Sequence, residues 1–119
     1  MKKIMIIEDN PIISKELYEL LVNAGYGALV LKDYKNAKEE ILRANVDLIL
    51  LDINIPYQNG EQLLKEIRKE TNIPVIMVTS RTNETDEILS ISYGADDYIT
   101  KPYSPTILLL RIQNIFKRL

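Results

Sequence analysis

Five side chains suited to metal or phosphoryl chemistry stand at the ends of short apolar runs in this sequence. They are Glu8, Asp9, Asp52, Thr79 and Lys101. If the runs are parallel strands, their carboxyl ends meet at one edge of a sheet, which is where open α/β sheets bind ligands. One acidic residue at a strand end carries little information because loops are wet, but five suitable residue types at one edge predict a site.

The three carboxylates in this set limit what the site can hold. In a sheet whose first and third strands are neighbours, Glu8 and Asp9 lie beside Asp52, and the three charges repel one another. A hard divalent cation removes the repulsion, and Mg²⁺ suits a few carboxylates, a backbone carbonyl and several waters. A carboxylate held beside Mg²⁺ and Lys101 is a credible nucleophile toward phosphorus, so Asp52 is a candidate for forming an aspartyl phosphate.

Composition excludes several other kinds of chemistry. The 119 residues contain no Cys and no His, which rules out disulfides, thiolate zinc sites and catalysis by Ser–His or Cys–His pairs. The 15 basic and 17 acidic residues give a net charge of −2, which predicts no nucleic-acid binding by this segment. The apolar runs are too short to span a bilayer, and a cytoplasmic location is the natural expectation without cysteine.

Apolar runs and helical segments alternate five times, which predicts one α/β domain over residues 1–119. The central runs are continuously apolar, as expected for parallel strands covered on both faces. The predicted strands are Lys3–Glu8, Ala28–Lys32, Asp47–Asp52, Pro74–Thr79 and Asp97–Thr100. Right-handed crossovers then give a three-layer, doubly wound parallel sheet. The strand order expected for it is 2-1-3-4-5, in which the first and third strands are neighbours.

The helices between the strands are predicted from apolar residues at helical spacing and from their end signals. The second runs from Tyr34 to Arg43, and the fifth begins with Ser104 as its N-cap and Pro105 at its first position. The apolar faces of the others are Ile13, Leu17, Leu20, Leu21 and Ala24 in the first, Leu63, Leu64 and Ile67 in the third, and Ile88, Leu89 and Ile91 in the fourth.

Four motifs, in this order and spacing, resemble the receiver domain of two-component response regulators over essentially the whole chain. They are residues 7–10 (IEDN), 50–56 (LLDINIP) with Gly60 eight positions after Asp52, 74–81 (PVIMVTSR) and 94–102 (GADDYITKP). The last motif is similar to the OmpR/PhoB branch, whose output is a winged-helix DNA-binding domain. The receiver fold implied by this resemblance is the flavodoxin-like sheet already predicted.

The resemblance implies the roles of the acidic residues and the lysine. Asp52 would accept a phosphoryl group from a sensor histidine kinase, and Lys101 would pair with the phosphoryl oxygens. Glu8, Asp9 and Asp52 would hold Mg²⁺ together with the backbone carbonyl of Asn54.

A switch is implied as well. The Thr79 hydroxyl would move to bond the phosphoryl group, small Ser80 would leave room for it, and Tyr98 would rotate inward. A tyrosine on an amphipathic edge strand needs no such role, so the structural interpretation of Tyr98 stays open. The turn after the last strand must aim Lys101 back at the acidic residues, which predicts a cis bond before Pro102.

Partners follow from the same resemblance. A homodimer would form on phosphorylation through the fourth helix, fifth strand and fifth helix, while the exposed side of the first helix would dock the kinase. The expected dimer face is Ile88, Ile91, Asp96, Asp97, Ile107, Leu109, Arg111 and Arg118, and the expected kinase surface is Asn10, Pro11, Ser14, Lys15 and Tyr18. DNA would be bound only through an effector domain that we expect to have been removed after residue 119.

Two other functions compete with a phosphorylation-driven switch. One is a pseudo-receiver, an interaction module whose acidic site no longer turns over, which the full set of matching polar residues disfavours. The other is a small phosphohydrolase or flavodoxin-like carrier. Phosphohydrolases with an aspartate nucleophile usually place a second acid two residues later, where this chain has Asn54, and four glycines leave no flavin phosphate loop visible.

Overall fold

A parallel five-stranded sheet forms the middle layer of the protein, in the predicted order β2-β1-β3-β4-β5. The computed structural model describes residues 1–81 and 83–118. The elements in chain order are β1 (Lys3–Ile7), α1 (Pro11–Asn23), β2 (Gly27–Val30), the 3₁₀ turn η1 (Tyr34–Asn36), α2 (Ala37–Ala44), β3 (Leu48–Leu51), α3 (Gly60–Ile67), β4 (Val75–Thr79), α4 (Glu84–Ser92), β5 (Asp97–Thr100) and α5 (Pro105–Lys117).

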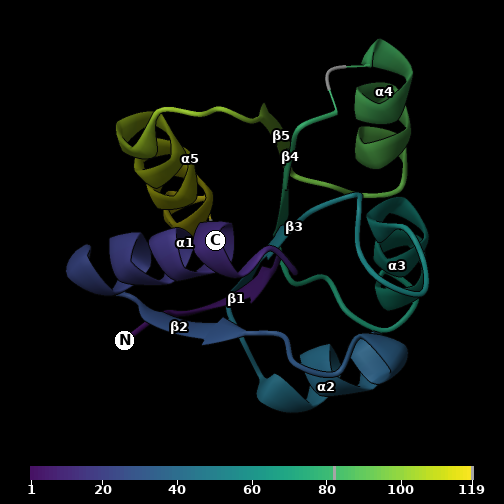
Figure 1. The fold of residues 1–119 in the computed structure, drawn as a ribbon, viewed down its shortest axis with the longest axis horizontal. Helices are drawn as coiled ribbons and strands as arrows, with labels where there is room; N and C mark the ends of the chain where they lie inside the picture. The colour runs from purple at the N-terminus through teal and green to yellow at the C-terminus, as the bar shows by residue number, and fades with distance from the viewer. Residues whose placement is uncertain (82, 119) are drawn as a thin grey trace.

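Helices cover both faces of this sheet, as Figure 1 shows. Helices α1 and α5 pack on one face through a core that includes Leu17, Leu21 and Ile112. Helices α2 and α3 pack on the other face through a core that includes Ile41 and Leu63. Because alternate strand residues point to opposite faces, strands covered on both sides must be apolar throughout, and β3 is buried at all four positions.

Strand register brings the polar strand ends together. Ile7 of β1 pairs with Leu51 of β3, so the residues that follow them, Glu8 and Asp52, leave the sheet side by side. Thr79 pairs with Thr100 at the ends of β4 and β5, one residue before Lys101. The site predicted from the ends of four strands therefore occupies one edge of the sheet.

End signals read from the sequence correctly locate α5, while α2 starts later than expected. Ser104 caps α5 by accepting a hydrogen bond from the amide of Ile107, and Pro105 opens the helix. The expected helix from Tyr34 to Arg43 is instead a 3₁₀ turn followed by α2, because the Asp33 side chain accepts from the Asn36 amide and tightens the first turn.

Helix α4 buries polar residues where the other helices bury apolar ones. Its buried residues are polar, Asp86 and Ser90, whereas Ile88 and Ile91 are 56% and 48% exposed. The apolar spacing correctly predicted a helix, and the exposure of Ile88 and Ile91 agrees with their place on the expected dimer face. Asp86 and Ser90 find polar partners on neighbouring segments. Within residues 1–81 and 83–118, no helix has the length and apolar character needed to cross a bilayer.

Candidate functional site

The centre of the site is an ammonium group held between two buried carboxylates. The Lys101 Nζ donates to Oε1 of Glu8 and, at 3.0 Å, to Oδ2 of Asp52. Glu8 and Asp52 are only 5% and 6% exposed. Two such carboxylates could not both remain ionised without a nearby cation, and Lys101 supplies one.

Backbone amides bind the remaining oxygens of the same two carboxylates. The Asn10 amide donates to Oε2 of Glu8 at 3.0 Å, and the Asn54 amide donates to Oδ1 of Asp52 at 3.2 Å. All four carboxylate oxygens of Glu8 and Asp52 therefore have partners. Both side chains are consequently held in fixed orientations at the edge of the sheet.

Proton affinities reflect this balance of burial and charge. Burial raises the pKa of Glu8, and the bonds from Lys101 and the Asn10 amide only partly offset it. For Lys101, burial by itself would lower the pKa, but the hydrogen bonds and charges of Glu8 and Asp52 outweigh burial and raise it. Lys101 is therefore a cation at neutral pH.

A close backbone approach holds the loop that follows Asp52. The Gly60 amide donates to the Ile53 carbonyl at 2.7 Å, and a Cβ at position 60 would lie 2.1 Å from the Asp52 carbonyl oxygen. Only glycine allows this approach without shifting the backbone. In the same loop Tyr57 has φ of 73°, and its exposed ring lies under the Lys35 ammonium.

The predicted magnesium ligands are brought to one edge but are not arranged around a common point. Asp9 is exposed, and Lys101 lies between Glu8 and Asp52. Among the described residues, no group of three carboxylates is placed to hold a metal ion as it stands. The donor set nevertheless fits a hard cation, because Glu8, Asp9 and Asp52 offer only oxygen ligands and two of them already share a positive group.

The predicted switch residues, Thr79 and Tyr98, are joined by Arg81. Thr79 is fully buried, and its hydroxyl accepts from the Arg81 amide at 3.4 Å. The Tyr98 ring is buried, and its hydroxyl donates to the Arg81 carbonyl at 2.9 Å. Tyr98 therefore takes the inward orientation that the sequence associated with the switched state.

Arg81 also joins the loop after β3 to helix α4, which sequence reasoning missed. Its guanidinium donates to the Asn54 side-chain oxygen at 2.9 and 3.2 Å and to Asp86 at 3.4 Å. Beside it, the Ser90 hydroxyl donates to Glu61 at 3.5 Å. Burial, followed by the nearby charge of Asp86, raises the pKa of Glu61. In the sequence, the signal for this cluster of Glu61, Arg81, Asp86 and Ser90 was Glu61, an acidic residue on the otherwise apolar inner face of α3.

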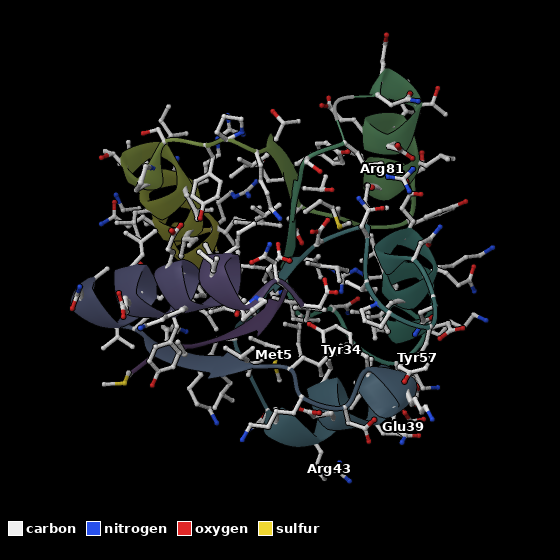
Figure 2. All side chains as sticks on the ribbon, viewed as in Figure 1. Met5, Tyr34, Glu39, Arg43, Tyr57 and Arg81 are labelled. Carbon is white, nitrogen blue, oxygen red and sulfur yellow. The ribbon has the colours of Figure 1, made fainter. Side chains whose placement is uncertain are left out.

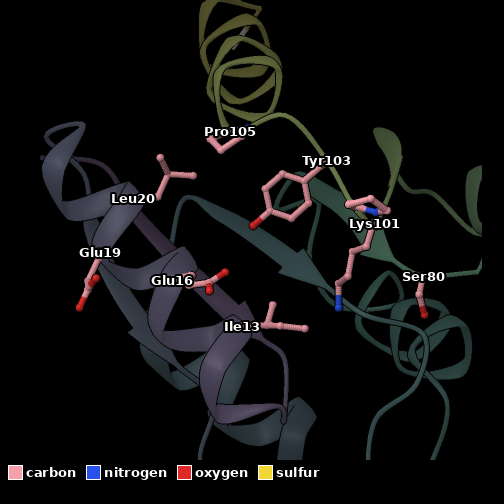
Figure 3. Close-up of a pocket in the computed structure, with 9 residues that line it drawn as sticks. Ile13, Glu16, Glu19, Leu20, Ser80, Lys101, Tyr103 and Pro105 are labelled. Atoms are coloured by element: carbon pink, nitrogen blue, oxygen red, sulfur yellow. The ribbon is translucent and has the colours of Figure 1, made fainter.

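A cleft of about 730 Å³ opens beside Lys101, between α1 and the start of α5 (Figure 3). Ile13, Leu20 and Tyr103 line it, with Glu16 on the α1 side. Burial, with the charges of Glu16 and Glu8, raises the pKa of Tyr103 to about 12. The Lys101–Pro102 bond next to the cleft is cis, as the sequence predicts.

The expected kinase surface on α1 is only partly exposed. Ser14 is buried, contrary to expectation, because its hydroxyl turns back to donate to the Pro11 carbonyl at 3.3 Å. Tyr18 is exposed, but it borders a separate hollow beside β2 with Leu29. Asn10, Pro11 and Lys15 are exposed as expected.

The expected dimer face is partly paired within the chain itself. The Arg111 guanidinium bonds Asp97 at 2.7 Å, and Asp96 pairs with Arg68 at 3.3 Å rather than with Arg118. Ile107 and Leu110 are about half exposed, whereas Leu109 is partly buried against the core. Ile107 and Leu110 therefore form an exposed apolar strip on α5, next to acidic residues that are already paired with arginines of the same chain.

Residues 4–113 match the family model described as the response regulator receiver domain. This chain belongs to that family. The sequence-based expectation of a receiver is thereby confirmed, and relatives named as transcriptional regulators agree with the OmpR/PhoB branch.

Named relatives match this receiver over nearly its whole length. The sensory transduction protein RegX3 of Mycobacterium tuberculosis is 39% identical over 118 residues, and the transcriptional regulatory protein CpxR of Klebsiella pneumoniae is 41% identical over 118. Each alignment covers 99% of this chain but only 52% and 50% of the relative. The receiver therefore spans about half the length of these relatives.

Solved structures place the receiver among close neighbours in fold. A two-component response regulator from Clostridium difficile superimposes with a TM-score of 0.94 at 27% identity, covering 99% of this chain and 98% of that one. The receiver domain of TorR, a response regulator of the TMAO respiratory system, superimposes with a TM-score of 0.89 at 36% identity, covering 99% and 98%.

Proposed function

We propose that this receiver takes a phosphoryl group from a sensor histidine kinase onto Asp52 and thereby switches a transcriptional output. The observation that carries the proposal is the placement of Asp52. It is nearly buried at the end of a central strand, with its Oδ2 3.0 Å from the Lys101 ammonium and its Oδ1 bound by an amide. These contacts fix the orientation of the Asp52 carboxylate and neutralise its charge, which prepares it to accept a phosphoryl group.

In that step, a carboxylate oxygen of Asp52 attacks phosphorus. The new O–P bond forms as the P–N bond to the donor histidine breaks, and the bonding pair stays on the imidazole nitrogen. Lys101 offsets the charge on the transferred oxygens. A bound Mg²⁺, held by Glu8, Asp9 and Asp52 with the Asn54 carbonyl, would supply further positive charge at those oxygens.

Output runs through Thr79, Arg81 and Tyr98. A phosphoryl group on Asp52 offers the Thr79 hydroxyl a charged acceptor, which competes with its present contact to the Arg81 amide. Because Tyr98 donates to the Arg81 carbonyl, a shift of Arg81 alters the packing of β5 against α4. The face formed by α4, β5 and α5 is therefore the proposed output and homodimer surface.

The proposed domain is a signalling switch, with self-phosphorylation and slow dephosphorylation as its only reactions. A cytoplasmic location and a DNA-binding effector domain in the whole protein belong to the same proposal. The alternative of a pseudo-receiver predicts no response to Mg²⁺ and no labelling.

The decisive test is labelling by a small phosphodonor. With Mg²⁺ and acetyl phosphate, intact-mass analysis should find one added phosphoryl group on the wild-type protein and none on Asp52→Asn. Beryllofluoride should bind only the wild type. Equal labelling of both proteins would exclude Asp52 as the acceptor, and no labelling of either would favour the pseudo-receiver.

A further inference from the structure

Two carboxyl groups that the proposed phosphoryl chemistry does not use are buried between α3 and α4. Glu61 of α3 and Asp86 of α4 are only 7% and 8% exposed. The Ser90 hydroxyl, one turn after Asp86 on the same side of α4, donates to Glu61 at 3.5 Å. The Arg81 guanidinium bonds Asp86 at 3.4 Å, and Figure 2 shows Arg81 beside α4. One cation thus faces two buried acids.

The positive charge of Arg81 does not balance both acids. Of the ion pairs among the described residues, one includes Asp86 and none includes Glu61. Arg81 also donates to the Asn54 side chain, and its own side chain is 43% exposed, so water screens its charge. Two neighbouring buried carboxyl groups with one such cation do not both ionise, so one of them keeps a proton.

The lysines nearest to Glu61 in the fold have other contacts. Lys65, one turn after Glu61 on α3, is exposed, and its ammonium lies over the Tyr93 ring. On the side of α3 that faces α2, Lys38 pairs at 2.8 Å with Glu70, which lies beyond the opposite end of α3. Neither lysine therefore neutralises Glu61.

Proton affinities agree with a carboxyl pair that holds one proton. Burial, followed by the charge of Asp86 and a hydrogen bond with it, raises the pKa of Glu61, and the Arg81 charge only partly offsets this. Tyr98 of β5 faces the same acids, and burial, followed by negative charges led by that of Asp86, raises its pKa to about 12. Glu87, the next residue of α4, is exposed and adds a further negative charge. The proton therefore lies on Glu61.

We propose that Glu61 and Asp86 share one proton across the α3–α4 interface, and that activation at Asp52, by moving α4 away from α3, releases this proton to water. This inference rests on the proposed function, which supplies the shift at α4. Helix α4 can move because its buried residues are polar, whereas Ile88 and Ile91 face outward. Once hydrated, Glu61 ionises to a carboxylate. By linkage, a rise in pH then favours the activated state.

Carbon-13 NMR of labelled glutamate side chains measures this proton directly. The Glu61 carboxyl signal, identified by its absence from Glu61→Gln, should titrate above 4.5 in the free protein. With Mg²⁺ and beryllofluoride the midpoint should fall towards that ordinary value, because α4 no longer covers the acid. Each pH unit of this fall favours the activated state about tenfold. The signal of Glu19, an exposed residue of α1, is the internal control and should not shift.

The Glu61→Gln variant tests whether the proton controls activation. Glutamine cannot ionise, but it keeps an acceptor for Ser90 and a donor for Asp86. Beryllofluoride binding is measured by calorimetry at saturating Mg²⁺. As pH rises from 5 to 8, the wild type should gain affinity severalfold relative to the variant, because only the wild type loses the proton that holds α4. Glu19→Gln is the matched control and should follow the wild type at each pH.

The outcomes distinguish this inference from the function beneath it. A Glu61 midpoint that beryllofluoride leaves unchanged would overturn the inference while leaving the chemistry at Asp52 intact. A constant ratio of affinities between Glu61→Gln and wild type from pH 5 to pH 8 would do the same. Failure of the wild type to bind beryllofluoride would overturn both proposals.

Discussion

Lys101 is the cation that pairs with both buried carboxylates of the site. The side chains of Glu8 and Asp52 are almost buried. The charge of Lys101 offsets the free-energy cost of burying these two carboxylates, and their charges offset the cost of burying the ammonium group. Because the pKa of Lys101 is raised in the folded protein, its contribution to stability is present at all pH values below the usual 10.5 and is lost as pH rises through the folded value. Removing the Lys101 charge at neutral pH therefore removes its whole contribution to the free energy of unfolding.

Replacing Lys101 by methionine keeps the length of the side chain and removes the charge. The free energy of unfolding should fall by about 1–3 kcal/mol, because two buried carboxylates lose their common partner. The loss should be larger at pH 8 than at pH 5, where Glu8, whose pKa is already raised, takes up a proton. Urea denaturation at the two pH values measures it.

Lys15→Met, an exposed change on α1, is the control for this experiment and should have little effect. Adding Glu8→Gln to Lys101→Met should recover part of the lost stability, since one of the two unpaired charges is then absent. Equal losses at both pH values would contradict the assignment of Lys101 as the neutralising group.

Helix α4 is held by polar contacts on its inner side, unlike the other long helices. Asp86 and Ser90 are buried against Arg81 and against Glu61 of α3, while the isoleucines of α4 point outward. Few apolar contacts and several polar ones make an element easy to move. The helix expected to relay the switch is thus the one with the least apolar anchoring.

The pH dependence of stability should reveal this polar interface. The folded protein holds the Glu61 proton more tightly than the unfolded chain, so stability falls as pH rises from about 4.5 through the raised folded pKa. Glu61→Gln cannot lose a proton and keeps an acceptor for Ser90. The variant should gain up to about 1 kcal/mol over wild type at pH 8 and nothing at pH 4.

Denaturation of Glu61→Gln and of wild type across pH 4–8 checks this expectation. Glu19→Gln, which changes an exposed residue on α1, should give a curve parallel to that of the wild type. A constant difference between Glu61→Gln and wild type would mean that Glu61 is ionised throughout and that its proton plays no part.

Two surfaces of the molecule, which share helix α5, are available to partners. The cleft between α1 and α5 joins apolar side chains to the acidic Glu16 and Glu19 beside Lys101. The α4-β5-α5 face exposes Ile88, Ile91 and Ile107. The cleft combines apolar and acidic side chains, whereas the exposed side chains named on the other face are apolar. We therefore expect the two surfaces to bind different kinds of partner.

For the kinase, the cleft favours an apolar helix with basic residues, because the α1 side of the cleft is acidic. Glu16→Lys should slow phosphoryl transfer from the cognate kinase severalfold while leaving labelling by acetyl phosphate unchanged. Tyr18→Ala, on the other side of α1, is the matched control. Slowing by Tyr18→Ala alone would instead place docking on the side of α1 that the sequence indicated.

For the homodimer, internal ion pairs change the expected balance of forces. Asp97 and Asp96 are already paired with Arg111 and Arg68, and exposed pairs contribute only about 0–1 kcal/mol each. Burial of the free apolar strip contributes about 25 cal/mol per Å². Sedimentation should find a mostly monomeric protein without beryllofluoride and a dimer with it that resists added salt. A dimer that dissociates steeply with salt would contradict this balance.

The sequence by itself determined the alternation of strands and helices and the edge of the sheet that carries the chemistry. Short continuous apolar runs between helical segments are typical of buried strands, and a polar residue directly after such a run leaves the sheet at its end. Glu8, Asp52, Thr79 and Lys101 were therefore placed correctly by local pattern alone. The caps of α5 were found for the same reason, since a cap bonds to residues within its own turn.

Only the tertiary structure decided which polar groups become buried away from the strand ends. Glu61 and Asp86 are buried because α3 and α4 meet there with Arg81 and Ser90. Periodicity assigns polar residues to the solvent side, so it did not indicate that Asp86 and Ser90 are buried. The reason is physical: burying a polar group is tolerated only when a distant segment supplies its partner, and local sequence does not contain that partner.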